Sequence, residues 1–154
     1  MKQTTLSIMI RDNQICLGKK LRGFAEGIYN GMGGKVELGE TPTQGIIREI
    51  KEEINIDISE KQLIYVGILH FIVEKEPKHS SDIHLFKITN FDGEPQKTDE
   101  IEPIWFPIDD IPYEKMWEDD KTWLPRIING EEDIEYNVIF ETISEGMKEL
   151  RKIK

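Results

Sequence analysis

Three glutamates stand at positions 49, 52 and 53, a spacing of i, i+3 and i+4. On a helix this spacing places all three carboxylates on one face within about a turn, where they repel one another. Arg48 lies four residues before Glu52 and could neutralise part of that charge, but two carboxylates remain. Hard oxygen ligands at such spacing are what Mg²⁺ or Mn²⁺ binds. The pattern predicts a divalent-metal site, with a solvated acidic helix face as the alternative.

The segment from Thr41 to Asn55 carries the signals of the helix that this chemistry needs. Thr41 suits the N-cap, Pro42 the first helical position, and Gln44 completes a capping box. Apolar residues recur at three- and four-residue intervals and predict one buried stripe opposite the acidic face. They are Ile46, Ile47, Ile50 and Ile54. Asn55 suits a left-handed C-terminal position, so we expect the helix to end at about Ile54.

The stretch before this helix is rich in glycine, with six between positions 23 and 39. Such a density favours a loop whose backbone turns tightly or approaches a ligand closely. The six are Gly23, Gly27, Gly31, Gly33, Gly34 and Gly39. A loop that leads directly into the acidic helix could form one wall of a site.

The spacing across this loop and helix resembles the Nudix box. From Gly34, five residues lead to Glu40 and seven more to Arg48; the rest of the pattern, through Glu49, Glu52, Glu53 and Ile56, also fits. Only Asn55 departs, standing where the family has glycine, and asparagine tolerates the left-handed conformation. The resemblance implies an α/β/α sandwich with mixed sheets that hydrolyses a nucleoside diphosphate linked to another group.

The same resemblance implies roles for individual residues. The metal ligands would be the carbonyl of Gly33 and the carboxylates of Glu49, Glu52, Glu53 and Glu100. The metal would be Mg²⁺, with Mn²⁺ possible. The catalytic set would be Arg48, Glu49, Glu53 and Glu100, in which Arg48 orients a glutamate and Glu49 or Glu100 accepts a proton, while Glu40 braces the loop. Glu100 lies outside the box, and Asp99 or Glu102 could supply the extra carboxylate instead.

Other motifs resemble the MutT-homologue branch that sanitises oxidised purine nucleoside triphosphates. They are Arg22-Gly23-Phe24, the segment 29–35 and the segment 116–120 with Trp123. The resemblance implies a base site formed by Thr5, Phe24, Asn30, Phe71, Trp117, Asp119 and Asp120. Lys20 and Lys35 would lie near the phosphates, and Met32, Gly33 and Gly34 complete the substrate-binding set. Ser81 stands where this branch often has a larger apolar residue.

The implied reaction is hydrolysis of a triphosphate such as 8-oxo-dGTP to the monophosphate and pyrophosphate, which sanitises the nucleotide pool. Two alternatives remain at this point: a Nudix hydrolase of another nucleoside diphosphate derivative, and a nucleotide-binding regulator without activity. Degenerate Nudix domains usually lose box glutamates, which this chain retains. An acidic protein-interaction module is a third reading, favoured only by the net charge.

The remaining elements predict an α+β domain with mixed sheets. Two strands, 5–10 and 15–18, form an expected hairpin, and strands 63–74 and 82–91 are expected to pair. Further strands are expected at 102–107 and 136–141, with a helix at 122–128. Residues 144–154 favour either a helix or a turn followed by a strand. At 154 residues the chain fits a single domain spanning 1–154.

Composition limits the partners. Thirty acidic against twenty basic residues give a net charge of −10, which argues against binding a nucleic-acid polymer.

Cys16, the one cysteine, lies in an apolar run with no partner cysteine, so we expect a small buried side chain. The apolar run near the N-terminus is too short for a signal peptide or a membrane span, which predicts a cytoplasmic protein without membrane contact. The choice between monomer and homodimer stays open.

Overall fold

A computed structural model describes all residues from Met1 to Lys154. The strands are β1 (Lys2–Arg11), β2 (Gln14–Lys20), β3 (Tyr29–Asn30), β4 (Ile64–Val73), β5 (Ser81–Ile88), β6 (Ile101–Pro107), β7 (Ile134–Phe140) and β8 (Met147–Lys152). The α-helices are α1 (Pro42–Ile54) and α2 (Asp120–Ile128). Four short 3₁₀ helices are η1 (Glu60–Gln62), η2 (Pro77–His79), η3 (Tyr113–Lys115) and η4 (Ile143–Glu145).

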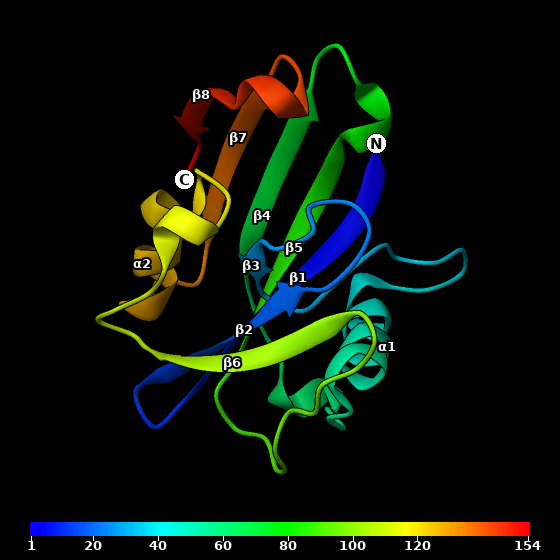
Figure 1. Cartoon of the computed structure of the whole chain (residues 1–154), viewed down its shortest axis with the longest axis vertical. Coiled ribbons are helices and arrows are strands. Elements are labelled where there is room, and N and C mark those ends of the chain that lie inside the picture. Colours follow the sequence, from blue (N-terminus) through cyan, green and yellow to red (C-terminus); the bar gives the residue numbers. More distant parts are fainter.

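All eight strands belong to one mixed sheet (Figure 1). Seven follow the order β3-β2-β1-β5-β4-β7-β8, and β6 pairs with the other edge of β2. β1 runs parallel to β5, and β4 runs parallel to β7, whereas the remaining pairs are antiparallel. The expected α+β class with mixed pairing is confirmed.

Two hydrophobic cores lie on opposite faces of the sheet. On one face α1 buries Ile46, Ile50 and Ile54 against Met9 and Phe86 in a cluster of 12 buried residues. On the other face α2 contributes Trp123, Leu124 and Ile127 to a cluster of 18. Each helix covers its face because its apolar residues recur at helical spacing. The expected α/β/α sandwich is therefore confirmed.

The glycine-rich loop is inserted between two diverging strands. β1 and β2 pair only near their hairpin, from Met9↔Cys16 to Arg11↔Gln14. Farther from the turn, backbone amides of β1 donate to loop carbonyls, from Thr5 to Gly34 at 2.9 Å and from Ser7 to Met32 at 2.8 Å. A Cβ at Gly33 would lie 2.0 Å from the Thr5 carbonyl oxygen, so only glycine permits this approach.

The helix signals in the sequence correspond to observed caps. The Thr41 side chain accepts from the Gln44 amide at 3.1 Å, and the Gln44 side chain accepts from the Thr41 amide at 2.9 Å. Asn55 ends α1 with φ of 57°, the left-handed conformation that its place in the pattern requires. The expected helix and both of its ends are confirmed.

Several boundaries differ from expectation. β1 and β2 are longer than expected and reach Lys2 and Lys20, although they pair with each other only beside their tight turn, which uses Asp12 and Asn13 at positive φ. Residues 144–154, for which the sequence left a helix or a strand open, contain a strand: β8 pairs antiparallel with β7 after Gly146, whose φ is 81°.

Cys16 is fully buried, as expected, and burial raises the pKa of its thiol to about 12. None of the helices has the length and apolar character needed to span a bilayer.

Candidate active site

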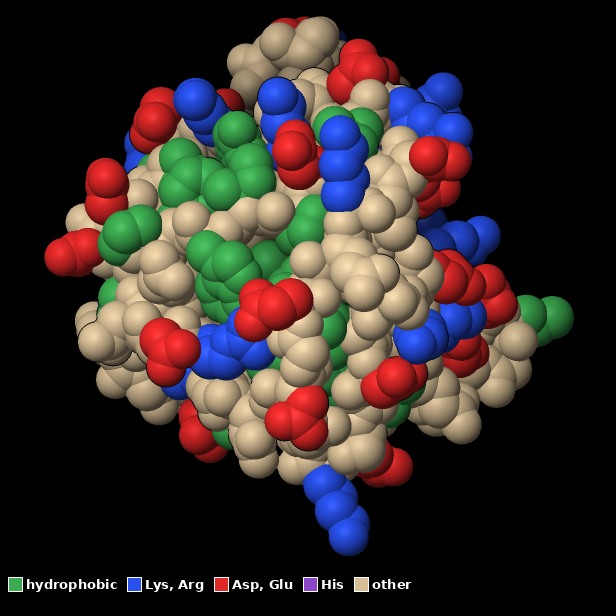
Figure 2. Space-filling model, turned by 60° about the horizontal axis from the view of Figure 1, so that its bottom comes forward, with side chains coloured by type: hydrophobic (Ala, Val, Ile, Leu, Met, Phe, Trp, Pro, Cys, Tyr) green, Lys and Arg blue, Asp and Glu red, His purple; other side chains and the backbone are tan.

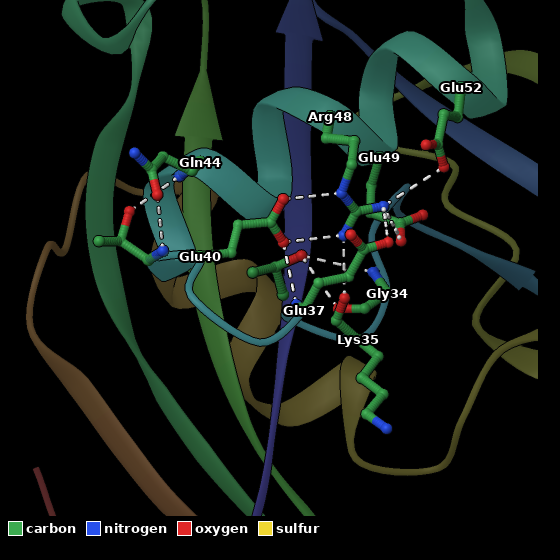
Figure 3. A network of polar contacts seen from close by, with 10 residues as sticks. Gly34, Lys35, Glu37, Glu40, Gln44, Arg48, Glu49 and Glu52 are labelled. Carbon is green, nitrogen blue, oxygen red and sulfur yellow. Dashed lines mark hydrogen bonds and ion pairs between the residues drawn. The ribbon is translucent and has the colours of Figure 1, made fainter.

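Arg48 holds the carboxylates of α1 together (Figure 3). Its guanidinium contacts Glu40 at 2.8 and 2.9 Å, Glu49 at 2.9 Å and Glu52 at 3.3 Å. It also donates to the backbone carbonyl of Lys35 at 3.0 Å, which ties the glycine loop to the helix. The expectation that Arg48 orients a glutamate agrees with this geometry, because Glu49 is fixed between Arg48 and Gly34.

Glu40 is the strongest partner of Arg48. Two parallel N–H donors meet its two oxygens, the bidentate geometry in which arginine binds carboxylates best. Hydrogen bonds from Arg48, followed by one from the Glu37 amide, lower the pKa of Glu40 to about 2. Glu40 therefore braces the loop as an ionised group.

Glu53 occupies a different environment on the same helix. Its carboxylate accepts the Gly33 amide at 2.8 Å and lines a cavity beside the sheet. Burial raises the pKa of Glu53 to about 8; the Gly33 hydrogen bond opposes this, and the charges of Glu49 and Glu100 add to it. Burial also raises the pKa of Glu49, against the contrary effect of Arg48. The surroundings of Glu49 and Glu53 therefore do not fully stabilise the negative charge of an ionised carboxylate.

The expected metal ligands are not gathered into a complete cage of side chains, since no three Asp, Glu, His or Cys side chains converge closely enough. Like charges repel, and each carboxylate takes the donor nearest to it. Glu52, with 59% of its side chain exposed, turns to Arg48, and Glu100, 61% exposed, pairs with Arg22 at 3.4 Å. Gly33, Glu49 and Glu53 form a core with Glu52 and Glu100 at its edge, and the expected set of five metal ligands stays a prediction.

This core fits a divalent cation. The carbonyl of Gly33 accepts no hydrogen bond, so its lone pairs are available beside two carboxylates with raised pKa values. Oxygen donors of this kind are what hard cations bind. A cation there would offset the charge that burial makes unfavourable.

A continuous cleft leads away from Glu53. Its first part has a volume of about 280 Å³ and runs from Glu53 and Lys20 to Trp117. Its second part, of about 200 Å³, reaches Asp119 and Asp120. The two parts share Leu6, Phe24, Asn30, Ile83 and Trp117 as lining residues. One end of the cleft therefore carries the glutamates and the other carries the two aspartates.

Ten of the expected substrate-binding residues line this cleft: Thr5, Lys20, Phe24, Asn30, Gly33, Gly34, Phe71, Trp117, Asp119 and Asp120. Two do not. Met32 is 1% exposed and packs in the core beneath α1, because alternation along the loop turns its side chain away from the cleft. The exposed Lys35 side chain points away from the carboxylate cluster in Figure 3. Glu100 lines an adjoining open hollow with Lys20 and Arg22.

Asp119 and Asp120 are each 3% exposed, an unusual burial for two adjacent carboxylates. One Asp119 oxygen accepts the Trp123 indole N–H at 2.8 Å, while its other oxygen and one oxygen of Asp120 have no partner. Burial raises the pKa of both groups, and the charge of Asp119 raises that of Asp120 further. The pair is therefore suited to holding a proton.

Aromatic rings surround these aspartates. Trp117 meets Phe71 edge to face at 5.5 Å and lies 6.2 Å from Phe24. Asn30 uses its side-chain oxygen to accept the Gly31 amide at 3.0 Å, which leaves its NH₂ group for a ligand.

Some lining residues were not anticipated from the sequence: Lys2, Leu6, His79 and Ile83. The parallel pairing of β1 with β5 brings Lys2 beside Ser81, so the first residues of both strands lie at the cleft. No local signal marks His79, because its position depends on a long-range strand pairing.

Surface charge is mixed on the face that Figure 2 shows. Acidic and basic side chains intermingle there around hydrophobic ones, and no extended basic area is present on that face. This distribution accords with the net charge of −10.

Fold and site together define a class of protein: an α+β sandwich whose glutamate-bearing helix lies at one end of a cleft, as in hydrolases of phosphate anhydrides. The NUDIX domain family model matches residues 1–127. The chain therefore belongs to the NUDIX family and is a hydrolase. Members of this family generally use divalent metal ions.

Named relatives extend this result. A Danio rerio protein named oxidized purine nucleoside triphosphate hydrolase is 38% identical over 135 residues, 88% of this chain and 85% of that protein. The Mus musculus protein of the same name is 36% identical, covering 80% of this chain and 78% of its own length. The crystal structure of a mutator MutT protein from Bacillus halodurans superposes with a TM-score of 0.85, covering 99% of this chain and 98% of that one. At 23% identity, that structure shows the shared fold alone.

Proposed function

We propose that this hydrolase converts oxidised purine nucleoside triphosphates, such as 8-oxo-dGTP, to the monophosphate and pyrophosphate, and so sanitises the nucleotide pool. The observation that carries the proposal is the buried Asp119–Asp120 pair, which shares one cleft with Glu53 of α1. The names of the fish and mouse relatives support the same substrate class.

The base end can distinguish an oxidised purine by the pattern of hydrogen-bond donors and acceptors on the base. Oxidation of guanine at C8 converts N7 from an acceptor into a donor, so the recognising group must accept a hydrogen bond there. Burial raises the pKa of both carboxyls, which favours a pair that shares one proton, and such a pair would offer a donor beside an acceptor. A mismatched buried donor or acceptor is unfavourable enough to reject the wrong base. Stacking on Trp117 would contribute about 1–3 kcal/mol per base.

The other end of the cleft holds the phosphates. Lys20 lines it beside Glu53, and the backbone of Gly33 and Gly34 forms its floor. Mg²⁺, or Mn²⁺ in its place, bound by Gly33, Glu49 and Glu53 would supply positive charge to the phosphate oxygens and make water a better nucleophile. Glu53 lines the cleft as a ligand of that cation, and Glu49 or Glu100 would accept the proton of the attacking water. Arg48 keeps Glu49 in position during this step.

A panel of normal and oxidised nucleoside triphosphates, together with nucleotide sugars and dinucleoside polyphosphates, tests the proposal with Mg²⁺ and then with Mn²⁺. We expect kcat/KM for 8-oxo-dGTP to exceed that for dGTP at least about tenfold, the discrimination that one buried hydrogen bond provides. Release of pyrophosphate, not of inorganic phosphate, should accompany it. Equal kcat/KM for the two nucleotides would leave a Nudix hydrolase and remove the sanitising role.

A further inference from the structure

Phe24 is unusual among the residues of the cleft, because 51% of this large apolar side chain is exposed. Its ring stacks face to face on His79, with centroids 4.9 Å apart and planes 9° from parallel. Trp117 lies on its inner side at 6.2 Å. Three rings thus form a row that begins inside the cleft and ends at the surface.

The outer pair joins two loops that are otherwise independent. The loop between β2 and β3 is closed at its base by hydrogen bonds from the Lys20 amide to Ile28 and from the Gly27 amide to Lys20, at 3.0 and 2.8 Å. No hydrogen bond or ion pair connects it to the loop between β4 and β5. The Phe24–His79 stack therefore holds the tip of the first loop against the second.

The loop that carries His79 has a firm anchor. The His79 amide donates to the Glu76 carbonyl at 2.9 Å, and the Val73 amide donates to the Ser80 hydroxyl at 2.8 Å. Lys2 in β1 donates to the Lys78 carbonyl at 3.3 Å. His79 is thus a fixed point against which Phe24 can rest.

Both rings border the base end of the cleft. Phe24 lines both of its parts, and His79 lines the part that contains Asp119, Asp120 and Ser81. Phe24 therefore borders the passage between the Glu53 end of the cleft and the aspartates. Separating the two rings exposes apolar surface but breaks no hydrogen bond, so the contact can open and close readily.

We propose that His79 is a positioning residue, which stacks on Phe24 and holds that ring as a clasp over the bound base. The inference rests on the proposed function, and it adds a residue that acts through Phe24 on substrate affinity and release. The glutamates of α1 lie at the other end of the cleft, so the clasp has no part in the bond-breaking step.

The first test is the kinetics of His79→Ala on the nucleotide with the highest kcat/KM in the panel. Loss of one aromatic pair should raise KM about threefold to tenfold and leave kcat equal or higher, because product leaves faster. His79→Phe should restore KM, since it rebuilds the stack, whereas His79→Leu should not. His84→Ala is the matched control: His84 bonds Gln3 and Tyr65 outside the cleft, so its loss should leave KM unchanged.

A double-mutant cycle distinguishes action through Phe24 from a general structural role. Affinity for 8-oxo-dGMP, measured by calorimetry without metal, should fall about threefold to tenfold in His79→Ala and should not fall further when that change is added to Phe24→Ala. Additive losses, or an unchanged affinity in His79→Ala, would overturn the clasp. If no nucleotide in the panel is hydrolysed, the proposed function fails, while the binding cycle still decides the clasp; absence of both hydrolysis and binding overturns both.

Discussion

The two ends of the cleft use carboxylates in opposite ways. At the α1 end, Arg48 contacts Glu40, Glu49 and Glu52, and the best-paired of them, Glu40, has its pKa lowered to about 2. At the α2 end, Asp119 and Asp120 are buried without a cation, and both pKa values are raised. The Arg48 network thus stabilises the negative charge of Glu40, whereas burial without a paired cation favours protons on the two aspartates, as it also does on Glu53.

This difference shows why one functional group can serve two purposes in one cleft. A carboxylate near cations and solvent stays ionised and can hold a metal or accept a proton. The same group, surrounded by Phe71, Trp117 and Trp123, keeps a proton and can donate a hydrogen bond to a base. Substitutions at the two ends should therefore change different kinetic constants.

The largest effect is expected for Glu53→Gln. This change removes a carboxylate that lines the phosphate end, so kcat should fall by roughly two to three orders of magnitude, the range typical for loss of a general base or of a charge-stabilising group. KM should change little. Steady-state kinetics with Mg²⁺, together with circular dichroism, measure both the activity and the fold.

Glu60→Gln is the matched control, because Glu60 is an exposed carboxylate on η1 outside the cleft. It should behave as the wild-type protein does. If Glu53→Gln kept near wild-type kcat, the assignment of the α1 end as the metal and phosphate site would be wrong.

The sequence predicted the two ends unequally for a physical reason. The α1 end is local: Gly34, Glu40 and Arg48 to Glu53 lie within one loop and one helix, so spacing alone places their side chains on a common face. The i,i+4 spacing also predicted the pairing of Arg48 with Glu52, but it did not predict that Glu100 would pair with Arg22, because that contact joins segments far apart in the chain.

The base end is assembled from distant segments. Asn30, Phe71 and Trp117 come from three separate parts of the chain, and the family resemblance, not periodicity, brought them together in the prediction. His79 was missed because its place follows from the parallel register of β1 with β5. The resemblance placed Met32 and Lys35 in the site, but Met32 packs in the core and Lys35 points to solvent, because tertiary packing that residue spacing does not encode sets side-chain direction along this loop.

The next effect concerns Asp119→Asn and Asp120→Asn. Each should raise KM for an oxidised purine triphosphate about tenfold to a hundredfold, the loss expected for one hydrogen bond that involves a charged group. Their kcat should fall much less, because neither residue lies at the phosphate end. A loss confined to kcat would contradict the division between the two ends, and an unchanged KM in both variants would remove the base site.

A smaller effect is expected for Arg48→Lys, which sharpens the comparison at the α1 end. Lysine retains the positive charge but lacks the planar fork that contacts both oxygens of Glu40. Groups that orient metal-binding carboxylates typically change activity about tenfold to a hundredfold, and we expect the lower value. Titration of activity against Mg²⁺ should show a raised metal requirement; an unchanged titration would mean that charge alone is sufficient.

The smallest effect is on stability, and it should have opposite signs at the two ends. In the folded protein the pKa of Asp120 is raised above 3.8, so its contribution to stability is fully present below about pH 3.8 and is lost as pH rises through the folded pKa. The pKa of Glu40 is lowered from 4.5 to about 2, so its contribution is present above pH 4.5 and is lost as pH falls. At pH 7 Asp120→Asn should therefore raise the free energy of unfolding, and Glu40→Gln should lower it by roughly 1–2 kcal/mol. Urea unfolding from pH 4 to 8 in the presence of EDTA measures both.

For Asp120→Asn the gain in the free energy of unfolding should shrink as pH falls toward 4, because the wild-type carboxyl then becomes protonated in the unfolded state also. If Asp120→Asn destabilised the protein at pH 7, burial of the Asp120 carboxyl would not be unfavourable in the folded state, and the contrast between Asp120 and Glu40 would fail. If Asp120→Asn instead stabilised the protein and raised KM, the Asp120 carboxyl would lower the stability of the fold while contributing to binding of the base.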